Sequence, residues 1–246
     1  MLNPIHKVLS TLKLNRVKFL LMGGQACVLY GAAEFSRDTD IALLASPDNL
    51  ENLVRALKDL SAEVVAVPPF QLNFLQGGHA VHFRCHHPEA EGMRLDVMAV
   101  MRGLPSFEVL WERRTTVQLA NDDIELMSLP DLVNAKKTQR DKDWPMIRRL
   151  AEAHYVSFRD EENTEKICFW LRELRTPVLL REVAERFPEF VERVADNRKF
   201  LGSLASMTDF DIEMALNKEE MVEREADRAY WKPLRKELET LRHFVG

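Results

Sequence analysis

The chain has 246 residues, of which 46% are hydrophobic, so it can bury the core of one large domain or two small ones. A formal net charge of −5 provides no global basic field, which excludes a large nonspecific nucleic-acid footprint. Three scattered cysteines without a CxxC pair fit free thiols, and the longest early apolar run is too short for a membrane span or a secretory leader, so we expect a cytoplasmic globular protein.

The first half of the chain alternates between strand and helix signals. The apolar run at 17–22 predicts a strand that ends at two glycines, and residues 25–32 predict a short helix closed near its end by Gly31. A second strand is expected at 38–45, after which Ser46-Pro47-Asp48 caps an amphipathic helix. Further strands are expected at 63–68, 79–87 and 93–101.

Helical periodicity replaces the strand signals from about residue 128. The preceding segment, 105–127, bridges the two halves and contains a hairpin pattern with Asn121-Asp122-Asp123 as its turn. We therefore expect an α/β (α+β) fold, in which a mixed sheet flanked by helices is followed by a mainly helical region. The predicted division is a core at 1–127 and a helical region at 128–246.

Two aspartates lie two residues apart on the second predicted strand. Because side chains alternate along a strand, Asp38 and Asp40 leave the same face and can converge on one ion. Carboxylate oxygens are ligands that suit Mg²⁺, and a cation would compensate their mutual repulsion. The alternative is that Asp38 caps a turn beside Arg37 while Asp40 is exposed on an edge strand.

A third aspartate lies in the middle of another strongly apolar strand. Asp96 is flanked by Leu95 and Val97, and an aspartate at such a position is rare. If its strand lies beside the first, the three carboxylates can hold two metal ions, and Asp96 can also accept the proton of an attacking hydroxyl. The glycine pair Gly23-Gly24 would let the backbone approach phosphate, although such pairs are usually only tight turns.

Together these residues resemble the nucleotidyltransferase superfamily with the DNA polymerase beta-like core. The shared pattern is Met22-Gly23-Gly24, thirteen intervening residues, Asp38-Thr39-Asp40 and then Asp96. The segment 23–43 looks most like the minimal bacterial branch that includes AbiE-type toxin nucleotidyltransferases. In that branch a glycine, a Ser or Thr and a basic residue precede the acids, and Gly31, Ser36 and Arg37 fill these places.

The resemblance extends to 129–150, where relatives place a lysine that reaches the triphosphate. Lys136 and Lys137 are the candidates, and a helix through this segment would put Lys136 and Arg140 on one face. The alternative is a solvated helix face on which Lys137 pairs with Asp141. Residues 128–150 would then complete the nucleotide site, and the resemblance covers roughly the first 150 residues.

The resemblance implies an enzyme that transfers a nucleoside monophosphate from an NTP such as ATP to an acceptor hydroxyl and releases pyrophosphate. Its metal ligands and catalytic residues would be Asp38, Asp40 and Asp96, with two Mg²⁺ ions or Mn²⁺ in their place. Nucleotide binding would fall to Gly23, Gly24, Ser36, Arg37, Lys136 and Lys137. The acceptor, which is an RNA end, a protein or a small molecule, is left open.

The competing class is an idle nucleotide-binding or regulatory module of a toxin–antitoxin or phage-defence pair, with an antitoxin or a second copy as its partner. A third class, a zinc-dependent hydrolase, would use the histidine-rich segment 79–87, but the spacing of its ligands is poor. We expect His82 and Arg84 on a strand beside Asp96, with His86 and His87 in a loop. We expect core packing for Trp144, Trp170, Trp231 and Tyr230.

Overall fold

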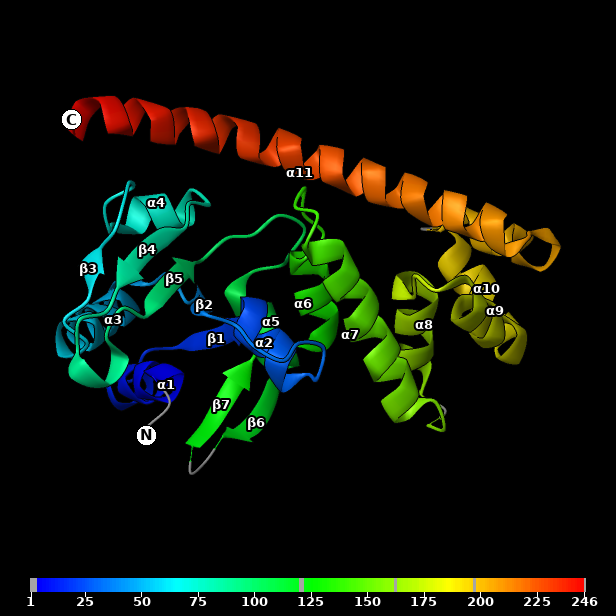
Figure 1. The fold of residues 1–246 in the computed structure, drawn as a ribbon, viewed down its shortest axis with the longest axis horizontal. Helices are drawn as coiled ribbons and strands as arrows, with labels where there is room; N and C mark the ends of the chain where they lie inside the picture. Colours follow the sequence, from blue (N-terminus) through cyan, green and yellow to red (C-terminus); the bar gives the residue numbers. More distant parts are fainter. Residues whose placement is uncertain (1–3, 120–121, 162, 197, 246) are drawn as a thin grey trace. The chain divides into compact units, whose positions relative to one another are not determined.

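The computed structural model describes residues 4–119, 122–161, 163–196 and 198–245. The chain divides into two compact units (Figure 1). The sheet unit extends to Leu29 and also contains Ala33–Ala135 and the residues from Tyr230 onward, while the helical unit contains Tyr30–Ala32 and Lys136–Ala229. The functional division at residues 127 and 128 stays a prediction.

The sheet unit contains all the strands of the described chain. They are β1 (Phe19–Met22), β2 (Asp38–Leu43), β3 (Glu63–Val64), β4 (Val81–Arg84), β5 (Arg94–Met98), β6 (Thr115–Leu119) and β7 (Asp122–Leu126). Its helices are α1 (Pro4–Leu14), α2 (Gly23–Leu29), α3 (Pro47–Asp59), α4 (Leu72–Gln76), the 3-10 turn η1 (Pro88–Ala90), α5 (Phe107–Arg113) and α6 (Leu129–Ala135).

The seven strands form one mixed sheet in the order β3-β4-β5-β2-β1-β7-β6. Strand β2 pairs in parallel with β5 and antiparallel with β1, and β1 pairs in parallel with β7. The predicted α/β (α+β) class is therefore confirmed. The expected hairpin is also present as β6 and β7, although Asn121 lies outside the described residues and Asp122 and Asp123 belong to β7 instead of the turn.

One face of the sheet is apolar because buried residues alternate with polar ones along its central strands. Thr39 and Ile41 on β2, like Leu95 and Val97 on β5, are buried. Helices α1 and α3 lie side by side in this unit (Figure 1). The buried side chain of Asn49 on α3 accepts a hydrogen bond from the Lys18 N–H, just before β1, over 2.7 Å. This hydrogen bond connects the helix to the sheet.

Local capping explains where α3 begins. Ser46 is its N-cap, with extended backbone angles, and its hydroxyl accepts from the Asn49 N–H, while Pro47 occupies the first turn. Sequence reading missed α1, whose buried Val8, Leu9 and Leu12 supply an apolar face within a polar-looking segment. The strand expected at 63–68 is shorter than predicted, because only Glu63 and Val64 pair, at an exposed edge of the sheet.

The helical unit begins after α6. It contains α7 (Asp143–Phe158), α8 (Thr164–Glu173), α9 (Pro177–Arg186), α10 (Pro188–Ala195), the 3-10 segment η2 (Lys199–Ser206) and the first part of α11 (Asp209–Val245). Trp144 and Trp170 are buried, as expected, whereas Trp231 and Tyr230 in the last helix are partly exposed. Within the described ranges, every helix is too short or too polar to cross a bilayer.

Candidate active site

The aspartates of β2 lie on the polar face of the sheet. Thr39 between them is fully buried, while Asp38 and Asp40 are partly exposed, so both carboxylates leave the face opposite Thr39. Strand β2 lies between β5 and β1. The alternative that Asp40 sits on an exposed edge strand is therefore wrong.

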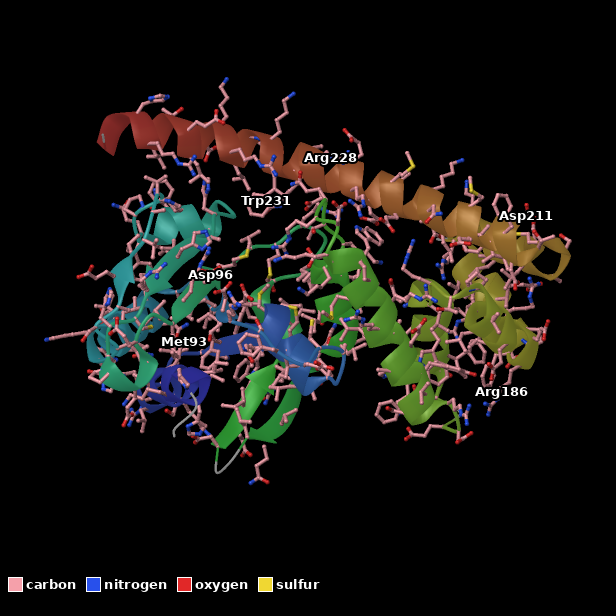
Figure 2. All side chains as sticks on the ribbon, viewed as in Figure 1. Met93, Asp96, Arg186, Asp211, Arg228 and Trp231 are labelled. Carbon is pink, nitrogen blue, oxygen red and sulfur yellow. The ribbon has the colours of Figure 1, made fainter. Side chains whose placement is uncertain are left out.

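The strand that carries Asp96 is the neighbour of β2. In the parallel register Asp40 is opposite Asp96, and Asp38 is opposite Arg94. Residues directly opposite each other on paired strands point to the same face. The structure thus places Asp38, Asp40 and Asp96 on one face of two adjacent strands, and Figure 2 labels Asp96 on β5.

The glycine pair contacts the second of these carboxylates. Gly23 has φ of +65°, and a Cβ at this position would lie 1.9 Å from Asp40 Oδ2. The Gly24 N–H donates to the same oxygen over 3.4 Å, and a Cβ on Gly24 would lie 2.3 Å from the Ser36 hydroxyl. Any larger residue at position 23 would therefore displace the Asp40 side chain. Gly23 is thus needed for its positive φ and for the space that the Asp40 carboxylate occupies.

Two basic side chains hold Asp96. Its Oδ1 lies 2.8 Å from Arg94 Nε and 2.8 Å from His82 Nδ1. Burial would raise the pKa of Asp96, but the hydrogen bonds from His82 and Arg94 outweigh it and lower the pKa. The hydrogen bond to Asp96 likewise raises the pKa of Arg94, with further contributions from the charges of Asp38 and Asp40. Asp96 is therefore ionised at neutral pH and already paired.

The position of His82 beside Asp96 was predicted and is confirmed, because the two residues are opposite in the antiparallel β4–β5 pair. His86 and His87 follow β4 in a loop, also as expected. Arg94 was missed by sequence reading. Its signal was available, since it precedes Asp96 by two residues on a predicted strand and must share its face.

The three carboxylates fit Mg²⁺ in their donor chemistry and in their strand register. Across the described part of the chain, however, no three His, Cys, Asp or Glu side chains are grouped closely enough to hold a metal ion. One oxygen of Asp96, Oδ1, contacts both Arg94 and His82, so a cation that binds all three carboxylates would have to reach the other oxygen or replace these contacts.

Ser36 and Arg37 precede Asp38 at the same end of β2. The Ser36 hydroxyl donates to the Asp38 carbonyl over 3.3 Å, and the Ser36 carbonyl accepts from Gln25 Nε2 at 2.7 Å. Ser36 therefore lies between the glycine pair and the aspartates. The Arg37 side chain is exposed.

The two candidate lysines belong to the helical unit and have carboxylate partners there. Helix α6 ends at Ala135, so the prediction that Lys136 and Arg140 share a helix face is wrong. Both instead bind buried Asp143, with 3.3 Å from Lys136 Nζ and 2.7 Å from Arg140 Nε. Lys137 Nζ lies 2.8 Å from Glu173, and residues 136–142 are not helical, so the solvated helix face of the alternative does not form.

The buried Asp143 explains why the helix is interrupted. Its carboxylate accepts from the Thr138 hydroxyl at 2.6 Å and from Lys136 and Arg140. These three donors lie in the turn between α6 and α7, and their hydrogen bonds stabilise it against continued helix. The Lys136 and Arg140 charges help to keep the pKa of Asp143 low although burial would raise it.

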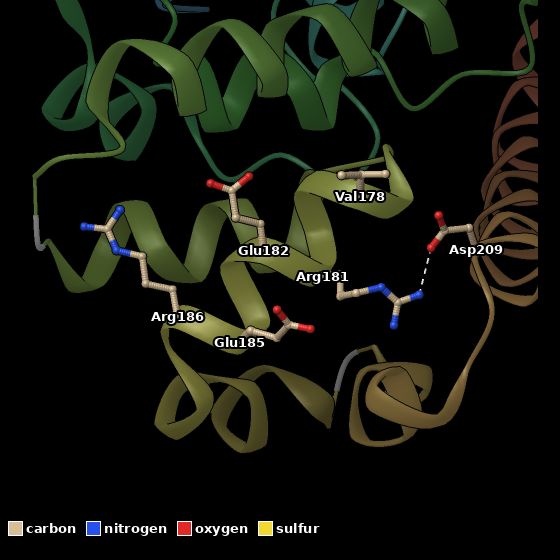
Figure 3. A pocket seen from close by; sticks show the side chains of 6 residues that line it. All are labelled: Val178, Arg181, Glu182, Glu185, Arg186 and Asp209. Carbon is tan, nitrogen blue, oxygen red and sulfur yellow. Dashed lines mark hydrogen bonds and ion pairs between the residues drawn. The ribbon is translucent and has the colours of Figure 1, made fainter.

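A pocket of about 690 Å³ lies elsewhere in the helical unit (Figure 3). Its lining residues are Val178, Arg181, Glu182, Glu185, Arg186 and Asp209. Arg181 donates to Asp209 and to the carbonyls of Leu204 and Met207, so it ties α9 to the start of α11. The pocket includes none of the predicted site residues.

Comparisons with known proteins provide little beyond this geometry. No protein-family model matches the chain, and no curated protein matches it. Among solved structures, the chain is similar to the crystal structure of an antigenic nucleotidyltransferase-like protein from Paracoccidioides brasiliensis. The identity is 15%, the alignment covers 77% of this chain and 89% of that chain, and the TM-score is 0.43. This similarity is too low to argue from.

Proposed function

We propose that the chain is a Mg²⁺-dependent nucleotidyltransferase of the DNA polymerase beta-like superfamily, close to the AbiE-type branch. The observation that supports this best is the register of β2 and β5, which places Asp38, Asp40 and Asp96 on one face next to Gly23 and Gly24. Arg94 and His82 offset part of the negative charge of this face, and a cation would further reduce the mutual repulsion of the three carboxylates.

In the proposed reaction an acceptor hydroxyl attacks the α-phosphate of an NTP in line with the leaving group. A bond forms between the hydroxyl oxygen and the α-phosphorus, and the bond to the oxygen that bridges the α- and β-phosphates breaks. Pyrophosphate leaves with that electron pair, and the hydroxyl proton passes to Asp96. Mg²⁺, when bound, neutralises the phosphate charge and favours the ionised hydroxyl.

The residues of this chain have separate tasks in the proposal. Asp38, Asp40 and Asp96 supply the oxygen ligands, and Mn²⁺ suits the same oxygens. Gly23 and Gly24 allow the triphosphate to approach the backbone next to Asp40, and Ser36 and Arg37 bind it from the same turn. Lys136 and Lys137 are proposed phosphate contacts, each of which exchanges its carboxylate partner for phosphate on nucleotide binding.

A second candidate function is a regulatory module that binds nucleotide without turnover, as the partner of an antitoxin or of a second copy. The observation that favours it is the pairing of Asp96 with Arg94 and His82, which engages one of the three carboxylates. In that case Asp96 is held permanently, and nucleotide binds without transfer.

The test is to incubate the protein with each α-³²P-labelled NTP and Mg²⁺, with and without cellular RNA, and to follow the label. Asp40→Asn is the inactive variant, and Asp160→Asn, at an exposed turn of the helical unit, is its matched control. Label on RNA or protein that Asp40→Asn loses and Asp160→Asn keeps supports transfer. Label that Asp40→Asn transfers at the wild-type rate contradicts the carboxylate assignment, and bound NTP without transfer favours the regulatory module.

A further inference from the structure

Basic side chains continue the polar face of the sheet beyond Asp96. His82 is opposite Asp96, and Arg84 is opposite Arg94 in the antiparallel β4–β5 register. The intervening Val81, Phe83 and Leu95 are buried on the other face. We call His82, Arg84 and Arg94 the basic strip, since all three share one face with Asp96.

The basic strip keeps donors that its internal contacts do not use. Arg94 binds Asp96 through Nε and lies 3.1 Å from His82 Nδ1 through one terminal nitrogen, which leaves its other terminal nitrogen, and its side chain is 41% exposed. His82 contacts both Asp96 and Arg94 through Nδ1. The Arg84 side chain is exposed, and no ion pair or hydrogen bond of its guanidinium occurs among the described residues.

The placement of Arg84 is unfavourable without an anion. Two arginines directly opposite each other on paired strands repel. Asp96 offsets the charge of Arg94, but Glu63, opposite Arg84 on β3, forms no ion pair with it within the described chain. A phosphate group would accept from Arg84 and Arg94 together, because guanidinium donors match phosphate oxygens in pairs.

The order of the strands indicates which substrate the basic strip lies near, the NTP or the acceptor. From the glycine pair at the end of β1 the polar face passes through Asp40 on β2 and Asp96 on β5 to the basic strip on β4 and β5. If the triphosphate of an NTP lies at the glycine pair, the acceptor approaches from the other side of Asp96. The basic strip is on that side.

We propose that the basic strip binds a phosphate group of the acceptor, so that the attacking hydroxyl belongs to an anionic molecule. This inference rests on the proposed nucleotidyl transfer and deepens it, because it disfavours cationic and neutral acceptors. Either an RNA end or a phosphorylated small molecule supplies the phosphate.

The test measures binding without NTP or metal, so it does not depend on turnover. One probe is a fluorescein-labelled RNA hexamer with a free 3′ hydroxyl, followed by anisotropy at several salt concentrations. The other is ribose 5-phosphate, measured by calorimetry against ribose. The variants are Arg84→Gln and Arg84→Glu, which lie outside the catalytic carboxylates, and the matched control is Arg55→Gln on the exposed side of α3.

We expect Arg84→Gln to weaken binding of one probe about tenfold and Arg84→Glu to weaken it further, with Arg55→Gln unchanged. For RNA, the slope of the logarithm of the binding constant against the logarithm of salt concentration should decrease by the amount expected for about one phosphate contact. The probe that responds identifies the source of the phosphate. Wild-type affinity in both Arg84 variants, or no binding of either probe by the wild-type protein, overturns the inference.

The two proposals fail in different ways. If Arg84 is required for phosphate binding but no label is transferred from any NTP, nucleotidyl transfer fails and the phosphate site stands. If label is transferred at the wild-type rate by Arg84→Gln and Arg84→Glu, the basic strip is not the acceptor site and nucleotidyl transfer stands.

Discussion

In the helical unit, buried Arg198 has its partners in the same unit, whereas the polar face of the sheet unit brings three carboxylates together on two adjacent strands. Arg198 shows the first arrangement, since its guanidinium donates to both oxygens of Glu219 and to the carbonyls of Leu171 and Leu174. Asp38, Asp40 and Asp96 show the second. The difference indicates that the helical unit uses charge to hold its helices, while the carboxylates of the sheet face are available to the cation of the proposed function.

The sharpest test of this comparison is Asp40→Asn. It should reduce nucleotidyl transfer by at least about 10³-fold, because it removes a charge from the reacting face. It should not lower the free energy of unfolding, since it also removes repulsion with Asp38 and Asp96. Rates and urea unfolding of the same preparation are compared, and a large loss of stability would show that Asp40 is structural.

Arg198→Met tests the other unit. Removing this buried guanidinium leaves the carbonyls of Leu171 and Leu174 without this donor and Glu219 with the longer 3.7 Å contact to Arg175, so we expect a loss of about 3–5 kcal/mol in the free energy of unfolding. Urea denaturation gives the value, and Arg193→Met, at an exposed position of α10, should change it by less than about 0.5 kcal/mol. Equal effects of the two variants would remove the contrast between the units.

His154 gives the helical unit a pH dependence. Burial lowers its pKa from 6.5 to about 4, and its Nδ1 accepts from Trp170 Nε1 at 2.9 Å, which requires the neutral ring. Because the folded-state pKa lies below the unfolded value, the protein loses stability as the pH falls from 6.5 toward 4. His154→Gln, which can still accept from Trp170, should reduce the stability difference between pH 7 and pH 5 by about 1–2 kcal/mol.

Unfolding of the wild-type, His154→Gln and His243→Gln proteins is measured at both pH values. His243 is exposed near the end of α11, so its replacement should leave the difference as in the wild type. A His154→Gln protein with the wild-type pH dependence would mean that His154 is not held neutral by burial.

A pair of glycine variants isolates the contact with Asp40. Gly23 and Gly92 have φ of +65° and +75°, but only at Gly23 would an added Cβ meet a side chain, Asp40. Each alanine should cost about 1–2 kcal/mol of stability through its backbone conformation. Gly23→Ala alone should also reduce transfer, by roughly tenfold or more, because it displaces Asp40. Equal transfer rates for Gly23→Ala and Gly92→Ala would show that the contact between Gly23 and Asp40 does not matter for the reaction.

The sequence was informative where a pattern is local. Alternation predicted that Asp38 and Asp40 share a face, and the cap at Ser46 marked the start of α3. The pairing of β2 with β5 could not be predicted in this way, because it joins residues more than 50 positions apart through hydrogen bonds that any strand offers. The same holds for the contact of His79, which follows α4, with Glu237 on the last helix, at 2.7 Å.

The error at 136–142 has a different cause. The composition of this segment favours helix, and four-residue spacing of Lys136 and Arg140 suggested a shared face. Tertiary structure overrides that preference, since Asp143 is buried and draws Lys136, Thr138 and Arg140 into one turn. A propensity of a few tenths of a kcal/mol per residue does not compete with an unpaired buried carboxylate.

The most direct test of the carboxylate site is the binding of Mn²⁺, measured by electron paramagnetic resonance in the presence of a nonhydrolysable NTP analogue. Mn²⁺ binds the oxygen ligands that Mg²⁺ uses. The wild-type and Asp160→Asn proteins should bind it alike, and Asp40→Asn should bind it at least about tenfold more weakly. The same affinity in all three proteins would contradict the assignment of Asp38, Asp40 and Asp96 as a cation site.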